Sequence, residues 1–99
     1  GAAYGEMFAA LTPDRAGAAR RRGSDIGFSR ALCRVNWQAD VTDGLRIGRT
    51  VYEQAALAPG FAADLETARA EVAAARAEGL TNPSCAAERR ALGVRPDAG

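Results

Sequence analysis

The sequence predicts an all-α fold, a helical bundle of about four to five helices, and three observations support this prediction. Between residues 61 and 79, apolar side chains recur at the three- and four-residue intervals of a helix with one apolar face. A capping residue followed directly by proline, which is typical of a helix start, occurs at Thr12-Pro13 and again at Asn82-Pro83. No segment alternates apolar and polar residues as a half-buried strand does.

The N-terminal segment is predicted to contain two helices. The first should extend to about residue 11, because four large apolar side chains share one helix stripe: Tyr4, Met7, Phe8 and Leu11. The second should begin at Thr12, which offers a capping hydroxyl ahead of a proline and an acid in the first turn. The sequence of this second helix contains three residues of low helix propensity: Gly23, Ser24 and Gly27. We therefore expect this second helix to be kinked or interrupted.

Three further helices are predicted after Trp37. The third, between Trp37 and Ala58, should be well buried along the stripe Val41, Leu45, Gly48, Val51, Tyr52 and Ala55. The fourth should run from about Pro59 to Gly79 along the stripe Phe61, Leu65, Ala68, Val72 and Ala75. A short fifth helix should carry Cys85, Ala86 and Leu92. Residues 1–93 are thus expected to form the helical part of one domain, followed by a flexible tail at residues 94–99.

Composition and charge exclude several classes of function. The formal net charge is only +1, which gives no field strong enough to attract nucleic acid or an anionic membrane. The basic run Arg20–Arg22 is shorter than a nucleic-acid-binding tail and indicates a solvated helix face. No apolar stretch approaches the ~18 residues of a membrane span. With no histidine and two cysteines, the chain has no credible zinc site, so we expect no metal and no cofactor.

One segment, residues 29–40, concentrates polar chemistry: it holds a hydroxyl, two guanidinium groups, side-chain amides and a carboxylate. Arg30 can bind two phosphate oxygens through its fork, and Ser29 can donate a third hydrogen bond. If the segment is helical or tightly turned, Asn36 and Asp40 lie one turn apart and can hydrogen-bond. Spacing alone leaves two interpretations open, a phosphate site and an ordinary helix end with solvated arginines.

The same residues match the signature S-R-x5-H-x3-D at every defined position except one, because Asn36 stands where the signature has histidine. Through this match the chain resembles the bacterial class A non-specific acid phosphatases, which belong to the wider phosphatidic-acid-phosphatase type 2 and vanadium-haloperoxidase superfamily. Family-like sequence also occurs at residues 37–41, 46–48 and 59–61 and in the helix that follows. Residues 4–15 resemble the helix that comes after the family's second signature, P-S-G-H.

The resemblance implies a phosphate pocket in which Ser29 and Arg30 bind phosphate and Asp40 orients the group at position 36. In the family one histidine attacks phosphorus and another protonates the leaving oxygen, which implies phosphomonoester hydrolysis through a phosphohistidine. Here Asn36 occupies the nucleophile position, and a carboxamide has no nitrogen that can form such an intermediate. The chain as given is therefore expected to bind phosphate, or vanadate as its analogue, with impaired turnover.

Two of the three family signatures, K-x6-R-P and P-S-G-H, do not occur in the chain. The resemblance therefore implies that the chain is the C-terminal part of one domain, whose missing N-terminal half could be a second chain. It also implies a periplasmic or secreted location. A phosphate-binding pseudoenzyme and a helical interaction module without a pocket stay as alternatives, and a homo-oligomer stays open.

The remaining distinctive side chains near the signature have structural interpretations. Trp37 is expected to be core or a pocket wall rather than a stacking platform for bases, because no interleaved basic patch accompanies it. Arg34, at a variable signature position, is expected to be a surface arginine. Cys33 and Cys85 can form an internal bridge in an oxidising compartment, although each thiol can also pair elsewhere.

Overall fold

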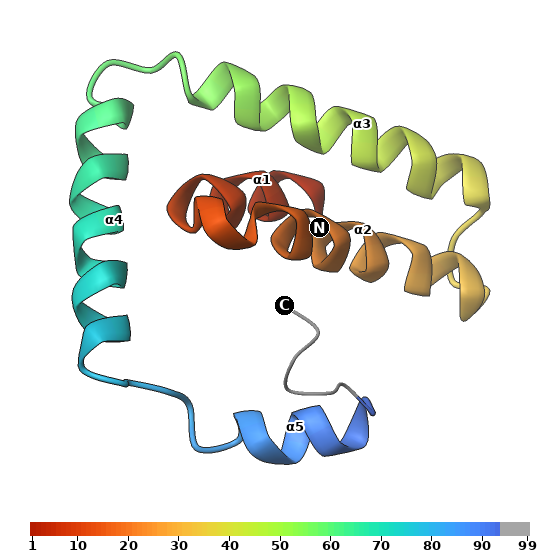
Figure 1. Ribbon diagram of the computed structural model, residues 1–99. Helices are drawn as coiled ribbons and strands as arrows, with labels where there is room; N and C mark the ends of the chain where they lie inside the picture. The colour runs from red at the N-terminus through yellow and green to blue at the C-terminus, as the bar shows by residue number, and fades with distance from the viewer. Residues whose placement is uncertain (94–99) are drawn as a thin grey trace.

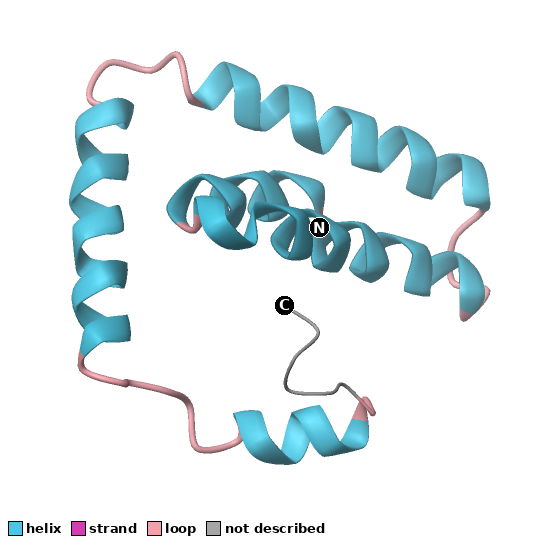
Figure 2. Cartoon of the chain, viewed as in Figure 1, coloured by secondary structure: helices cyan, strands magenta, loops and turns pink. Residues whose placement is uncertain are grey.

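The computed structural model describes residues 1–93, and every regular element in that range is helical (Figure 2). The elements are α1 (Ala2–Leu11), the 3₁₀ turn η1 (Pro13–Arg15), α2 (Ala16–Leu32), α3 (Gln38–Ala55), α4 (Phe61–Ala77) and α5 (Cys85–Ala91). The predicted all-α fold is thus confirmed for this range. The tail expected at residues 94–99 lies outside the described residues.

Helix α1 is the central element, and it packs against α2, α3 and α4. Figure 1 shows α1 and α2 side by side, with α3 along one side of the pair, α4 across one end, and α5 on the side opposite α3. The assembly is flat, with extents of 42 × 41 × 18 Å. Because a helix with its side chains is about 10–12 Å across, the short dimension leaves little room for an interior.

Glycine allows α1 and α2 to approach until their backbones touch. A Cβ atom added at Gly23 would lie 2.8 Å from the carbonyl oxygen of Gly1 and 3.1 Å from the Cα of Gly5. Gly5 and Gly23 are both buried in this contact. The expected interruption of the second helix is wrong, since α2 is one continuous α-helix from Ala16 to Leu32. Gly23 serves close packing, which compensates for its low helix propensity.

This close contact also decides which face of α1 is buried. The face that packs inward carries Gly5 and Ala9, whereas Tyr4 is 67% exposed and Phe8 is 53% exposed. The large apolar stripe predicted for this segment is therefore only partly covered, since Met7 and Leu11 are half-buried, and it is not the most buried face. Hydrophobic spacing alone misplaces it because small side chains permit the nearest approach between helices.

The core is correspondingly small. Its buried apolar side chains are Ala9, Val41 and Leu45, and the last two lie on the first half of α3 with exposed fractions of 7% and 8%. The second half of α3 leaves Ile47 and Val51 exposed, so the expectation that this helix is well buried holds only for its N-terminal half. Many large apolar side chains in residues 1–93 are therefore left in contact with solvent.

The fourth helix agrees with its prediction in both position and face. All five predicted stripe residues of α4 are half-buried, and left-handed glycines flank the helix at Gly60 (φ 86°) and Gly79 (φ 70°). Polar contacts attach α4 to the preceding elements: Arg69 Nε donates to the carbonyl oxygen of Ala10 at 2.7 Å. Arg76 donates to both carboxylate oxygens of Asp14, at 3.1 and 2.7 Å.

The two predicted helix-start signals act differently. Thr12 does not cap the second helix, because its hydroxyl donates to the carbonyl oxygen of Phe8 at 2.8 Å and so closes α1 instead. At the other signal, Asn82 Oδ1 accepts the backbone N–H of Ser84 at 2.8 Å, immediately before α5. This bond forms an Asx turn ahead of the helix. The N-cap residue of α5 is Ser84, and no side chain caps the helix, so the cap predicted at Asn82 is wrong.

The ion pair between α4 and η1 gives a first testable prediction. The hydrogen bond from Arg76 holds the pKa of Asp14 below its ordinary value of 3.8. A depressed carboxyl pKa stabilises the docked state above pH 3.8, and this contribution is lost as the pH falls through the lower, folded pKa. NMR titration of the Asp14 carboxyl should therefore give a midpoint below 3.8, and Arg76→Gln should raise that midpoint. Equal midpoints in the two proteins would show that the pair does not form in solution.

Candidate functional site

The site is built by the turn that ends α2. The N–H of Val35 donates to the carbonyl oxygen of Arg30 at 2.9 Å, and the N–H of Arg34 donates to that of Ala31 at 3.0 Å. With Arg34 in the left-handed region at φ 57°, these two bonds form a Schellman motif. The motif reverses the chain, and the N–H of Asn36 returns to the carbonyl oxygen of Arg30 at 3.2 Å.

This reversal brings two predicted site residues into direct contact. Arg30 Nε donates to Asn36 Oδ1 at 2.6 Å. Asn36 is half-buried and Arg30 is exposed. Together with Asp40 they line a hollow of about 270 Å³, whose other walls come from the start of α1 and from the facing sides of α2 and α3. Arg30, Asn36 and Asp40, which lie apart in the sequence, thus share one surface.

Asp40 has a different hydrogen-bond partner from the expected one. Its Oδ2 accepts the backbone N–H of Trp37 at 3.0 Å, which places the carboxylate at the N-terminus of α3. Among residues 1–93, no hydrogen bond joins the side chains of Asn36 and Asp40. The reason is the helix boundary: α3 begins at Gln38, so Asn36 precedes the helix and is not one helical turn from Asp40.

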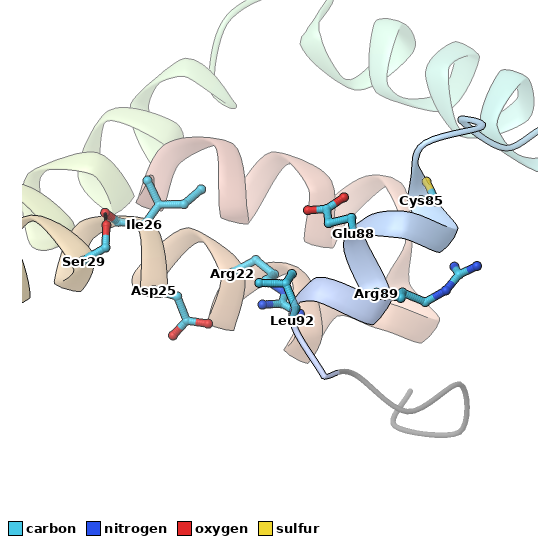
Figure 3. A pocket seen from close by; sticks show the side chains of 8 residues that line it. All are labelled: Arg22, Asp25, Ile26, Ser29, Cys85, Glu88, Arg89 and Leu92. Carbon is cyan, nitrogen blue, oxygen red and sulfur yellow. Dashed lines mark hydrogen bonds between the residues drawn. The ribbon is translucent and has the colours of Figure 1, made fainter.

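Ser29 lies apart from this group. Its hydroxyl donates to the carbonyl oxygen of Ile26 at 2.8 Å, within its own helix. It lines a separate hollow of about 550 Å³ between α2 and α5, where Figure 3 shows it beside Ile26 and across from the α5 side chains. Adjacent residues on a helix point in different directions, so Ser29 and Arg30 do not converge on one surface.

A third hollow, of about 590 Å³, adjoins the first on the other side of Asn36 and Asp40. Its walls include Arg34 and Trp37, and the Trp37 side chain is 82% exposed. Trp37 is therefore a pocket wall and not a core residue. Sequence spacing could not identify this hollow, because it depends on the left-handed backbone of Arg34, where glycine is the usual residue.

Cysteine, metal and membrane features are limited in the part of the chain that the structure describes. Cys33 is exposed, Cys85 is half-buried, and both are free, so the internal bridge is not formed. No group of three or more metal-ligating side chains occurs within residues 1–93. In the same range, no helix combines the length and the apolar character needed to cross a bilayer.

Comparison with known proteins gives a partial similarity. Over 74 residues, the chain is 34% identical to a non-specific acid phosphatase of Salmonella typhimurium, a match that covers 71% of this chain and 30% of the relative. Over 60 residues it is 35% identical to a non-specific acid phosphatase of Salmonella typhi, covering 61% of this chain and 24% of that relative.

The chain thus matches less than a third of the length of these curated relatives. No family model matches it, and no solved structure matches it. What the comparisons establish is a distant and partial similarity to bacterial non-specific acid phosphatases.

Proposed function

We propose that the chain is the C-terminal helical part of an acid-phosphatase-like domain and that Arg30 binds the phosphate of a phosphomonoester. The observation that carries this proposal is the hollow shared by Arg30, Asn36 and Asp40, in a chain whose matched relatives are non-specific acid phosphatases. The proposal includes a periplasmic or secreted location for the protein.

The geometry of Arg30 supports a role in binding. Its Nε–H is engaged by Asn36, which fixes the plane of the guanidinium group beside the hollow. The two terminal nitrogens carry four further N–H donors, arranged as the fork that matches two phosphate oxygens. The amide nitrogen of Asn36 takes no part in the hydrogen bond with Arg30, so it is a second, neutral donor at the hollow.

The chemistry of Asn36 supports binding with impaired turnover. In a phosphohistidine mechanism, a ring nitrogen uses its lone pair to form the bond to phosphorus while the bond to the leaving oxygen breaks and that oxygen gains a proton. The amide nitrogen of asparagine has no such lone pair, and its oxygen already accepts the bond from Arg30. A phosphate-binding pseudoenzyme is therefore the form of the proposal that this residue favours.

The remainder of the phosphate pocket is assigned to the missing N-terminal half of the domain. Many large apolar side chains are exposed on residues 1–93, among them Phe28, Leu32 and Val35 beside the site. The buried apolar core comprises three residues, which is small for an independent domain. The same exposed surface is the observation that favours the alternative of a helical interaction module without a phosphate site.

The test is phosphate binding by an Arg30 variant. Arg30→Ala should weaken binding of phosphate or vanadate about ten- to a hundredfold, since a hydrogen bond to a charged group contributes ~1.5–3 kcal/mol. Isothermal titration calorimetry with vanadate measures this loss. Arg90→Ala is the matched control, because Arg90 is an exposed arginine on α5, outside the hollow. Equal affinities in the two variants would favour the interaction module.

A further inference from the structure

The hollow beside Arg34 and Trp37 has the features of a ligand site in its own right. Its volume of about 590 Å³ lies within the range of roughly 300–1,000 Å³ that is usual for small-molecule pockets. Arg30 does not line it, so it is distinct from the phosphate hollow although Asn36 and Asp40 border both. The phosphate-binding role proposed for Arg30 does not use this second space.

Trp37 supplies an unoccupied aromatic face to the hollow. Its side chain is 82% exposed, and it makes no aromatic pair within residues 1–93, where the recorded pair joins Tyr52 and Phe61. Trp37 forms a bond through its backbone N–H, which donates to Asp40 and orders the start of α3. The backbone is therefore fixed while the indole ring lies open, which is a suitable arrangement for stacking a planar ring.

Arg34 supplies a positive charge whose position is set by the backbone. Its φ of 57° is a conformation that non-glycine residues adopt rarely, and such residues cluster at functional sites. The two hydrogen bonds of the Schellman motif hold the backbone of Arg34 in this conformation. The Arg34 side chain lines the hollow. Within the described residues, the Arg34 guanidinium takes part in no hydrogen bond or ion pair.

We propose that this hollow binds a planar aromatic ring that carries an anionic group. The ring stacks on Trp37, and the anion accepts hydrogen bonds from the Arg34 fork. Asp40 borders the same hollow with a negative charge, so the anionic end of the ligand lies toward Arg34. The shared chemistry is that of an aromatic carboxylate or an aryl phosphate, and the proposal does not depend on phosphate binding by Arg30.

The test uses the fact that Trp37 is the single tryptophan of the chain, so its fluorescence reports on this hollow alone. Titration with 4-nitrobenzoate should quench the emission saturably, whereas cyclohexanecarboxylate, with equal charge and no aromatic ring, should not compete. Arg34→Gly removes the charge and suits the left-handed backbone, so the variant should melt no lower than the parent. It should bind 4-nitrobenzoate at least about fivefold more weakly.

Two further variants complete the design, with affinities measured by calorimetry. Trp37→Ala should weaken binding of 4-nitrobenzoate roughly five- to a hundredfold. Arg90→Ala, on α5 and outside the hollow, should leave it unchanged. Tighter binding of 4-nitrophenyl phosphate than of 4-nitrobenzoate that Arg34→Gly abolishes would identify an aryl phosphate as the better ligand. Quenching that never saturates, or equal affinity in Arg34→Gly and the parent, would overturn the proposal. Loss of 4-nitrobenzoate binding in Arg90→Ala as large as in Trp37→Ala would overturn it as well.

Discussion

Asn36→His is expected to raise phosphatase turnover by roughly a thousandfold or more once the rest of the domain is supplied, because it restores a covalent nucleophile. Imidazole extends further than a carboxamide, so its outer nitrogen can reach a phosphorus atom held by Arg30. Asp40 uses one carboxylate oxygen for the N–H of Trp37, and the other can accept the inner ring N–H of the new histidine. That bond would fix the tautomer and stabilise the cation formed on phosphoryl transfer.

The measurement is hydrolysis of 4-nitrophenyl phosphate at mildly acidic pH, with trapping of an acid-labile phosphoenzyme. The protein is assembled with an upstream segment that carries K-x6-R-P and P-S-G-H. The control is the double variant Asn36→His/Asp40→Asn, which keeps the nucleophile but removes the charge that orients it, and it should lose most of the gain. If the parent turns over as fast as Asn36→His, or if neither forms a phosphoenzyme, position 36 is not the nucleophile position.

Gly23→Ala is expected to destabilise the protein by ~1–3 kcal/mol, even though alanine is the better helix former. The added methyl would meet backbone atoms of Gly1 and Gly5 at 2.8 and 3.1 Å, so a whole helix must shift to admit it. In a chain of this size such a loss lowers the Tm by at least about 4 °C. Thermal denaturation followed by circular dichroism measures the change.

Gly44→Ala is the matched control for this substitution. Gly44 lies within α3, and a Cβ there would meet no atom within 4 Å. With no steric cost, alanine should stabilise the helix by ~0.5–1 kcal/mol, so the two glycine variants should change the Tm in opposite directions. A higher Tm in both variants would mean that α1 and α2 do not touch in solution as the structure has them.

The sequence predicted those parts of the fold that depend on local patterns. The half-buried face of α4 was predicted correctly from the spacing of its apolar residues. Its C-terminal boundary at Gly79 was predicted correctly from the preference of glycine for a left-handed backbone. The buried face of α1 was misplaced because contact between backbones at Gly5 and Gly23 is a tertiary property that hydrophobic spacing does not encode.

The same distinction applies to the candidate site. Arg30, Asn36 and Asp40 were selected from their chemistry, and the structure places them around one hollow. Their partners could not be predicted, because these depend on where α2 ends and α3 begins. A left-handed arginine at position 34 reverses the chain so that the guanidinium of Arg30 meets Asn36. Ser29 faces a different hollow because it is the neighbour of Arg30 on the same helix.

The attachment of α4 has a consequence for how the molecule opens. None of its side chains is buried, and its recorded hydrogen bonds to α1 and η1 come from Arg69 and Arg76. Arg76 makes an exposed ion pair, which contributes little free energy, and α5 beyond it packs still more loosely, so α4 and α5 can detach while α1, α2 and α3 stay folded. The amide protons of both helices would then exchange with solvent through local openings, and a protease would cut in the connections on either side of α4. The helices that carry Arg30, Asn36 and Asp40 belong to the more persistent unit.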